Sequence, residues 1–234
     1  AEGDRLTAHA LLYKQIFEEI GLTQGKVLIY GKSEVGKHYA ILGRLAELLP
    51  GLDFRGDLED AVLLQAMATK EIEEIERIRE MGKIVVSVVS RVAAFLTGHQ
   101  VVNETLTKPN GSPLLIEDVK KKINLWLAES GAENPENTIF AIGRDAGIPH
   151  SSGTPTEPLR LGQTIVFDIF PCEKGGGYFY DFTRTWCLGY APENVQTLYD
   201  QVKSVYHQII NELETNKNAA VFQYPTCELF DAMG

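Results

Sequence analysis

Apolar positions at the start of the chain alternate between helical and strand spacings. Residues 7–20 repeat apolar side chains at helical spacing and stop at Gly21, and residues 27–30 form a short apolar run that is typical of a buried strand. Helical spacing returns over residues 39–49 and ends at Pro50. This order of helix, strand and helix predicts an α/β fragment, part of a sheet domain rather than a whole one.

A longer amphipathic helix is predicted from residue 69 to about residue 97. Its first half is rich in charge and includes Glu73 and Arg77, whose i,i+4 spacing favours an ion pair along the helix. The composition changes between residues 53 and 60, so we expect a boundary between domains there. The apolar stripe of this helix consists of Ile72, Ile75, Ile78, Met81, Val85, Val88, Val92 and Phe95.

Two further helices are predicted in the second half of the chain. Ser112 as N-cap and Pro113 at the first helical position predict a helix that ends at Gly131. An amphipathic helix is expected over residues 194–214. Its predicted inward side chains are Val195, Leu198, Val202, Val205, Ile209 and Leu213.

Composition and charge limit the classes of partner. The 234 residues are 44% hydrophobic, with a net charge of −10, a pI near 5.0 and a mean hydropathy of −0.11. The chain has no block of Lys and Arg, so nucleic acid and anionic membrane are not expected as partners. No apolar run is long enough to span a membrane, and the first residues do not have the pattern of a signal peptide.

The cysteines indicate a reducing compartment. Cys172, Cys187 and Cys227 are odd in number, widely spaced and form no C-x-x-C pair. This pattern favours reduced thiols over a disulfide or zinc framework. We therefore expect a cytoplasmic protein.

A segment near the N-terminus is similar to a phosphate-binding loop. Residues 31–38 read GKSEVGKH and lie between a predicted strand and a predicted helix. Magnesium binding requires a Ser or Thr hydroxyl at the position that His38 occupies. We therefore interpret this segment as a strand-to-helix turn with solvated lysines.

A predicted β-hairpin brings two carboxylates together. Strands are expected over residues 164–170 and 178–188. If the turn is centred between residues 174 and 175, Asp168 lies directly opposite Asp181. Glu173, beside the turn, is expected to be solvated.

Like charges at opposed positions destabilise a sheet unless a cation or a shared proton lies between them. Thr183 shares the face of Asp181, whereas Arg184 points to the other face and is not a suitable counter-ion. A divalent metal ion is therefore the simplest explanation of the pair. The alternative is a solvent-facing Asp168 or a different register that separates the two side chains.

Three segments of the second half carry a family resemblance. Residues 137–150 (NTIFAIGRDAGIPH), 161–168 (LGQTIVFD) and 180–186 (YDFTRTW) resemble the core of the pita-bread metallopeptidases, in the branch of Xaa-Pro aminopeptidases and prolidases. The resemblance implies an α/β (α+β) chain. Residues 59–234 would be the first part of a pita-bread (creatinase/aminopeptidase-like) catalytic domain, and residues 1–58 the end of a smaller α/β, creatinase-type N-terminal domain.

The resemblance also implies roles for four residues. Asp168 would be a metal ligand, and Asp181 would bridge two metal ions. His150 would contact the substrate near the scissile bond and stabilise the tetrahedral intermediate, and Thr183 would orient the cluster. Two divalent ions, Mn²⁺ in the first place and otherwise Co²⁺ or Zn²⁺, would activate the water that hydrolyses the peptide bond before proline.

The same resemblance implies a further His ligand and two Glu ligands downstream. After Asp181 the only histidine is His207, which is expected on a helix surface, so the 234-residue chain is expected to be a truncated and inactive part of an enzyme that forms a homodimer. Two alternatives stay open. One is a non-catalytic pita-bread binding or scaffold protein, and the other is a metal-independent, creatinase-like C–N hydrolase.

Overall fold

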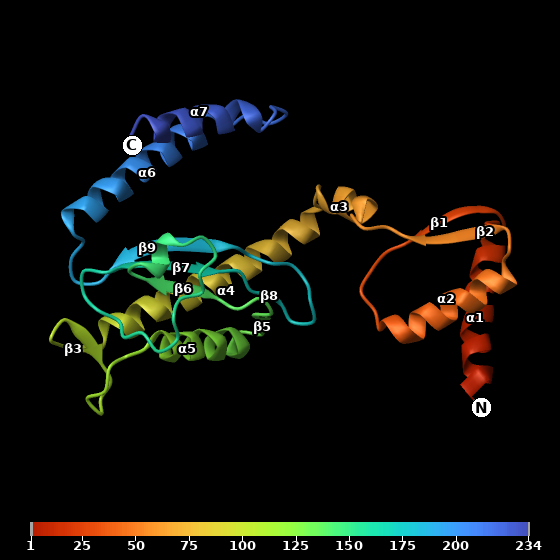
Figure 1. The fold of residues 1–234 in the computed structure, drawn as a ribbon, viewed down its shortest axis with the longest axis horizontal. Helices are drawn as coiled ribbons and strands as arrows, with labels where there is room; N and C mark the ends of the chain where they lie inside the picture. Colours follow the sequence, from red (N-terminus) through yellow and green to blue (C-terminus); the bar gives the residue numbers. More distant parts are fainter. Residues whose placement is uncertain (1, 234) are drawn as a thin grey trace. The chain divides into compact units, whose positions relative to one another are not determined.

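The computed structural model describes the backbone of residues 2–233 and the side chains of residues 5–233. The chain divides into two compact units, with the division between Glu71 and Ile72 (Figure 1). Each unit is described by itself. No helix within residues 2–233 has both the length and the apolar character needed to cross a membrane.

The first unit is an α/β fragment, as the hydrophobic pattern predicts. Strands β1 and β2 pair in parallel, with Gly25 opposite Leu52, and its small core contains Ala10, Leu45 and Leu49. Its elements in order are α1 (Glu2–Glu19), β1 (Gly25–Ile29), α2 (Val35–Leu48), β2 (Leu52–Gly56) and α3 (Ala61–Met67).

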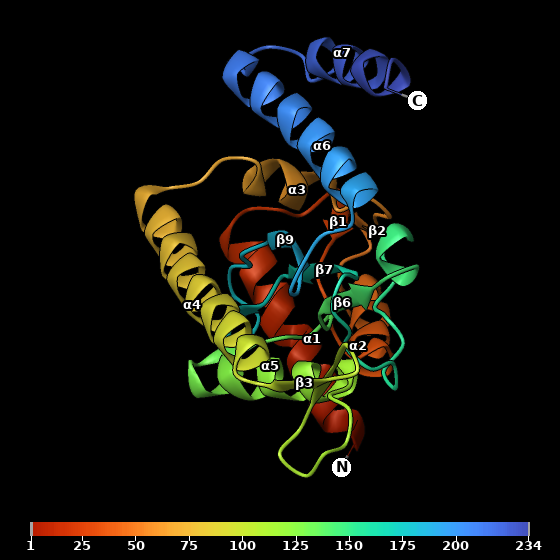
Figure 2. The same ribbon diagram turned by 90° about the vertical axis from the view of Figure 1, so that its left-hand side faces the viewer.

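The second unit contains a three-stranded antiparallel sheet in the order β6–β7–β9 (Figure 2). A short 3₁₀ helix, η1 (Asp145–Gly147), follows β6. The helices of this unit are α4 (Ile72–Thr97), α5 (Ile116–Glu129), α6 (Glu193–Glu212) and α7 (Ala220–Asp231). The strands are β3 (Gln100–Val102), β4 (Thr105–Thr107), β5 (Ala132–Glu133), β6 (Ile139–Ile142), β7 (Thr164–Ile169), β8 (Cys172–Glu173) and β9 (Phe182–Cys187).

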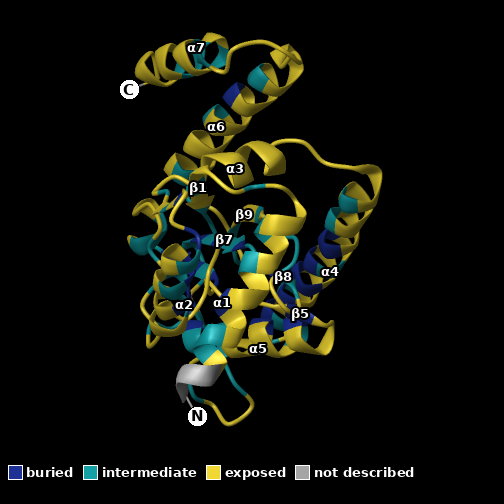
Figure 3. Cartoon of the chain, turned by 90° about the vertical axis from the view of Figure 1, so that its right-hand side faces the viewer, coloured by how far each residue is buried: buried dark blue, intermediate teal, exposed yellow. Residues whose placement is uncertain are grey.

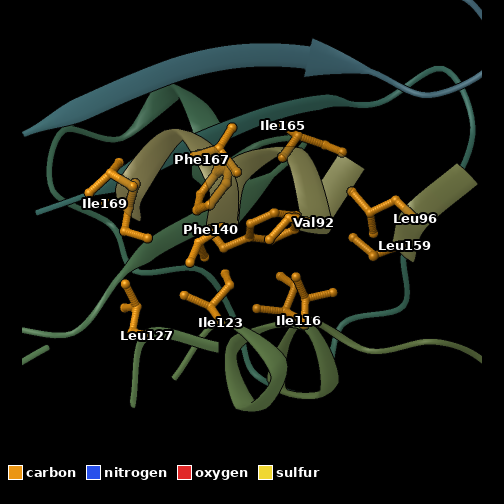
Figure 4. Close-up of a cluster of buried hydrophobic side chains, with 14 of the residues drawn as sticks. Val92, Leu96, Ile116, Ile123, Leu127, Phe140, Leu159, Ile165, Phe167 and Ile169 are labelled. Atoms are coloured by element: carbon orange, nitrogen blue, oxygen red, sulfur yellow. The ribbon is translucent and has the colours of Figure 1, made fainter. Parts of the chain in front are cut away.

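One face of this sheet packs against α4 and α5 and forms the main core (Figure 4). Burial alternates along β7, where Ile165, Phe167 and Ile169 are buried, while Val166 and Asp168 between them are half-buried. Phe140 of β6 joins Phe167 with ring centroids 5.4 Å apart. The alternation therefore leaves the second face of the sheet for polar side chains.

Two predicted helix starts need correction. The helix expected from residue 69 begins at Ile72. The helix expected from Pro113 begins at Ile116, because the N–H of Leu115 donates a hydrogen bond of 3.0 Å to the Asp118 carboxylate. Ser112 instead donates through its hydroxyl to the Asn110 side chain in the preceding turn. The cap therefore comes from a residue inside the first helical turn and not from the serine before it.

The predicted inward stripe of the last long helix is also wrong in half of its positions. Within α6 only Val205 is buried, whereas Leu198 and Val202 are exposed, and so is Leu213 just after the helix (Figure 3). The reason is that α6 packs mainly on α7 in the part of the chain that the structure describes, so no sheet lies beneath its apolar stripe.

Candidate metal centre

The open face of the sheet places Asp168 on β7 directly opposite Thr183 on β9. The predicted pairing of Asp168 with Asp181 is therefore wrong by two residues. The same register continues toward the turn, where Cys172 bridges to Phe179 and the N–H of Glu173 donates to the Tyr178 oxygen at 3.0 Å, so the turn is centred one residue later than predicted. Regular pairing of β7 with β9 ends at Ile169 and Phe182, so Asp181 lies just outside it.

The two carboxyl groups nevertheless meet. Burial raises the pKa of Asp181, and the negative charge of Asp168 and a hydrogen bond between the two carboxyl groups raise it further. Because like charges at this separation repel, the pair favours a shared proton or a cation between the two side chains. Asp168 and Asp181 are thus close together, as predicted from the sequence, although they are not directly opposite each other in the hairpin.

Arg184 does not neutralise this pair, as strand alternation predicts. Its guanidinium carbon lies 3.9 Å from the centroid of the Phe182 ring, and its terminal nitrogen donates to the backbone oxygen of Thr183 at 2.7 Å. Thr183 itself points to the open face, where its hydroxyl donates a hydrogen bond of 2.7 Å to Asp168 Oδ1. One oxygen of Asp168 is therefore fixed in direction by the neighbouring strand.

His150 lies beside this pair at the end of a short loop that follows η1. A cavity of about 230 Å³ is lined by both His150 and Asp168, with Ile139, Ile148 and Val166 as apolar walls. The backbone of His150 is left-handed, with φ of +60°. The structure thus brings together His150, Asp168, Asp181 and Thr183, the four residues that the resemblance named.

Three contacts hold the His150 loop over the sheet. The ammonium group of Lys120 donates to the backbone oxygen of Ser152 at 2.5 Å, and the hydroxyl of Thr154 donates to the Asp145 carboxylate at 3.0 Å. Gly153 has φ of +81°, and a Cβ atom there would lie 2.3 Å from the backbone oxygen of Phe140. Only glycine lets the loop approach β6 this closely.

The donor set fits a hard divalent cation. Carboxylate oxygens are the ligands that Mg²⁺ and Mn²⁺ prefer, and two of them converge here with unbalanced charge. Among the described residues, no group of three or more His, Cys, Asp and Glu side chains is arranged to hold a metal ion. Asp168 and Asp181 can therefore supply part of a coordination shell.

His207 and residues 31–38 are distant from this centre in the sequence. His207 was expected on a helix surface and residues 31–38 as a strand-to-helix turn, and the structure agrees with both expectations. His207 is exposed on α6, with its ring 5.5 Å from that of Tyr206. Lys32 and Lys37 are exposed in and just after a short turn between β1 and α2, and His38 lies within α2. The lysines are solvated, as expected of an ordinary strand-to-helix turn.

One ion pair in this unit was not predicted from the sequence. Glu173 was expected to be solvated and Arg77 to pair with Glu73, but Arg77 Nε donates to Glu173 at 3.0 Å and a second Arg77 nitrogen binds the same carboxylate. The N–H of Tyr178 also donates to Glu173 at 3.0 Å. No local spacing signals a pair whose members lie 96 residues apart.

Comparison with known proteins gives a family match and a set of similar folds. The sequence profile described as "Metallopeptidase family M24" matches residues 76–231. No curated protein sequence matches the chain.

Three solved structures illustrate the similarity of fold. A dipeptidase from Pyrococcus horikoshii has a TM-score of 0.73 at 20% identity, with 96% of this chain and 56% of that chain covered. An X-Pro aminopeptidase from Thermotoga maritima has a TM-score of 0.72 at 16% identity, with 97% and 57% covered. A prolidase from Pyrococcus furiosus has a TM-score of 0.63 at 21% identity, with 93% and 59% covered. The chain thus has the pita-bread fold, as expected, and spans little more than half the length of these proteins.

Proposed function

Because this chain belongs to metallopeptidase family M24, we propose that it is part of a metal-dependent peptidase that hydrolyses the bond before proline. The observation that supports this best is the Asp168–Asp181 carboxyl pair on the open sheet face, next to His150. The names of similar structures, among them an X-Pro aminopeptidase and a prolidase, support a proline-containing peptide as substrate.

In this proposal Asp168 and Asp181 would hold the divalent ions, with Asp181 as the ligand common to both. When bound, the ions supply an activated water and a Lewis acid for the peptide carbonyl. Mn²⁺ is the first candidate, with Co²⁺ or Zn²⁺ as alternatives, since the described donors are carboxylate oxygens. Thr183 keeps Asp168 in the direction that ligation requires.

His150 acts on the substrate and not on the metal. From the cavity that it shares with Asp168, its imidazole donates a hydrogen bond to the peptide carbonyl oxygen and stabilises the negative charge that develops there. Ile139, Ile148 and Val166 line the same cavity, and these apolar walls suit the ring of a proline residue.

The proposal includes the remaining expectations for the whole protein. Residues 1–58 are the end of a creatinase-type N-terminal domain, and residues 59–234 are the first part of the catalytic domain. The protein works as a cytoplasmic homodimer. Its location is supported by Cys172, Cys187 and Cys227, which are all free thiols.

The test is hydrolysis of an Xaa-Pro dipeptide and of an Xaa-Pro tripeptide by the full-length protein with added Mn²⁺. We expect turnover that is lost in Asp181→Asn and retained in Asp200→Asn, a control on the surface of α6. Activity no greater than that of Asp181→Asn would contradict the proposal. The metal content of the purified protein separates the alternatives, because a scaffold protein or a creatinase-like hydrolase would hold no stoichiometric metal.

A further inference from the structure

Asp181 lies at the end of the regular β7–β9 ladder, on the side of the hairpin turn. Asp168 lies within the β7–β9 ladder, whereas the last pair of that ladder joins Ile169 to Phe182, one residue beyond Asp181. On the other side of Asp181, the N–H of Tyr180 donates to the backbone oxygen of Pro171 at 3.1 Å. The hairpin register thus continues past Asp181 to Cys172 and Phe179, and contacts of this end of the hairpin with the rest of the unit decide how firmly Asp181 is held next to Asp168.

The closest of these contacts joins Tyr180 to Gly82 of α4. The Tyr180 ring is half-buried against the main core, and Gly82 is buried beneath it. A Cβ atom on Gly82 would lie 2.7 Å from Tyr180 Cε2 and 3.0 Å from Cζ, which is closer than real Cβ contacts. The ring therefore lies directly on the helix backbone, and any larger residue at position 82 would displace it.

A second group of contacts joins the preceding turn to the same helix. Arg77 holds the Glu173 carboxylate through two of its nitrogens and lies over the Tyr178 ring, with the guanidinium carbon 4.7 Å from the ring centroid. The Tyr178 hydroxyl donates to Glu74. Glu173 also accepts the N–H of Tyr178 at 3.0 Å, which closes the turn between the two residues.

These contacts come from one side of α4. Glu74 and Arg77 are three residues apart on one face, and Gly82 follows Met81, which lies one turn beyond Arg77 and is buried in the core. The chain from Glu173 to Tyr180 follows this face on its way from β8 to β9 (Figure 1). The helix is fixed by its core packing and can therefore act as a rigid support.

We propose that α4 positions the bridging metal ligand, with Tyr180 seated on Gly82 and the Arg77–Glu173 ion pair together holding Asp181 next to Asp168. Tyr180, Gly82, Arg77 and Glu173 are positioning residues, and none of them lies in the cavity that His150 and Asp168 share. This inference rests on the proposed function, because it assigns Asp181 to a metal centre.

The first experiment compares two arginines of the same helix. Arg77→Met removes the ion pair with Glu173, and Arg79→Met is the matched control, because Arg79 is similarly exposed and pairs with Glu76 one turn away on the same helix. In the metal-free chain, the amide NMR signals of Asp181 and Phe182 shift in Arg77→Met and stay unchanged in Arg79→Met. The other signals of the sheet report that both variants are folded.

The second measurement is paramagnetic broadening of the same signals by Mn²⁺. In the wild-type chain Mn²⁺ broadens the signals of Asp168, Asp181 and Thr183. In Arg77→Met we expect about 10-fold more Mn²⁺ to be needed for equal broadening, the lower end of what loss of a residue that orients a ligand typically costs. A folded Arg77→Met with wild-type signals and wild-type Mn²⁺ dependence would overturn the inference.

A pair of glycines provides an independent test. Gly82→Ala places a methyl group against the Tyr180 ring, whereas Gly43→Ala in α2 places it in open space, and both changes raise helix propensity equally. We expect weaker Mn²⁺ binding in Gly82→Ala only. If Gly82→Ala does not fold, the exposed Arg77→Met variant still decides the question.

The two proposals fail in different ways. A wild-type chain in which Mn²⁺ broadens no signal at Asp168 and Asp181 contradicts the proposed metal centre. The amide shifts of Asp181 in the metal-free variants still show whether α4 sets its position. Unchanged shifts in both Arg77→Met and Gly82→Ala contradict the positioning role alone.

Discussion

Thr183 and Asp168 are direct partners in the antiparallel ladder, and the Thr183 hydroxyl donates a hydrogen bond of 2.7 Å to Asp168 Oδ1. The backbone pairing and the side-chain bond therefore fix the same carboxylate. Residues that orient a metal ligand in this way commonly matter for metal affinity although they do not touch the metal.

This relationship predicts the effect of Thr183→Val. The isosteric change removes the hydroxyl, leaves Asp168 free to rotate, and should weaken Mn²⁺ binding by about 10- to 100-fold, as is typical for loss of such a partner. Thr185→Val is the matched control, since Thr185 lies on the same face but pairs with Val166. Mn²⁺ titration followed by NMR measures both, and equal losses in the two variants would contradict the prediction.

The carboxyl pair predicts a pH dependence of stability in the metal-free chain. Burial, the charge of Asp168 and the hydrogen bond between the two carboxyl groups raise the pKa of Asp181 in the folded state. Folded-state stability is therefore lost as the pH rises from the ordinary Asp pKa through the raised value. Asp181→Asn should be more stable than wild type at neutral pH, and the difference should vanish in acid.

Urea unfolding without metal across this pH range measures the effect. Added Mn²⁺ should stabilise the wild-type chain and not Asp181→Asn, because only the wild type keeps the proposed site. A wild-type chain that loses no stability relative to Asp181→Asn on going from acid to neutral pH would show that the two carboxylates do not interact.

The loop that carries His150 predicts a contrast between two glycines. Gly153→Ala forces a Cβ atom against the backbone oxygen of Phe140 and strains a left-handed residue, whereas Gly147→Ala meets nothing within 4 Å. We expect Gly153→Ala to lower kcat of the full-length peptidase by displacing His150, with metal binding unchanged. Gly147→Ala should keep the wild-type kcat, and a normal kcat in Gly153→Ala would refute the argument.

The start of α5 predicts a second pH effect, of opposite sign. Burial raises the pKa of Asp118, but its hydrogen bonds from Lys108 and from the Leu115 N–H outweigh burial and leave the pKa below its ordinary value. The stabilisation is present above the ordinary Asp pKa and is lost as the pH falls through the lowered value.

Asp118→Asn should therefore cost about 0.5–2 kcal/mol at neutral pH, the usual range for a lost helix cap, and less in acid. Urea unfolding checks this against Glu117→Gln, whose ion pair with Lys121 lies on the surface. A loss in Asp118→Asn that is the same at every pH would point to packing rather than charge.

The sequence predicted where helices and strands lie better than it predicted which residues pair or pack with one another. Hydrophobic spacing located α1, β1 and α2, the long helix α4 and the strands β7 and β9, because these signals are local. It placed Asp168 opposite the wrong residue, since register depends on where the turn is centred, and the turn lies one residue later than predicted.

Contacts distant in sequence were not predictable at all. The bond of Arg77 to Glu173 and the approach of Tyr180 to Gly82 depend on tertiary packing across about a hundred residues. The apolar stripe of α6 was predicted to be buried because its spacing is that of a packed helix, yet half of its residues are exposed in the described chain. Amphipathic spacing shows that one face of a helix is apolar, but it does not show which part of the protein covers that face.

The left-handed backbone of His150 affects how this residue should be replaced in any kinetic study. A φ of +60° is tolerated by Asn, Asp and Gly far better than by Ala or by a β-branched residue. An alanine there would remove the imidazole and add backbone strain, so a fall in rate would mix two causes. Asn keeps the loop conformation and isolates the contribution of the ring, which makes His150→Asn the more informative substitution.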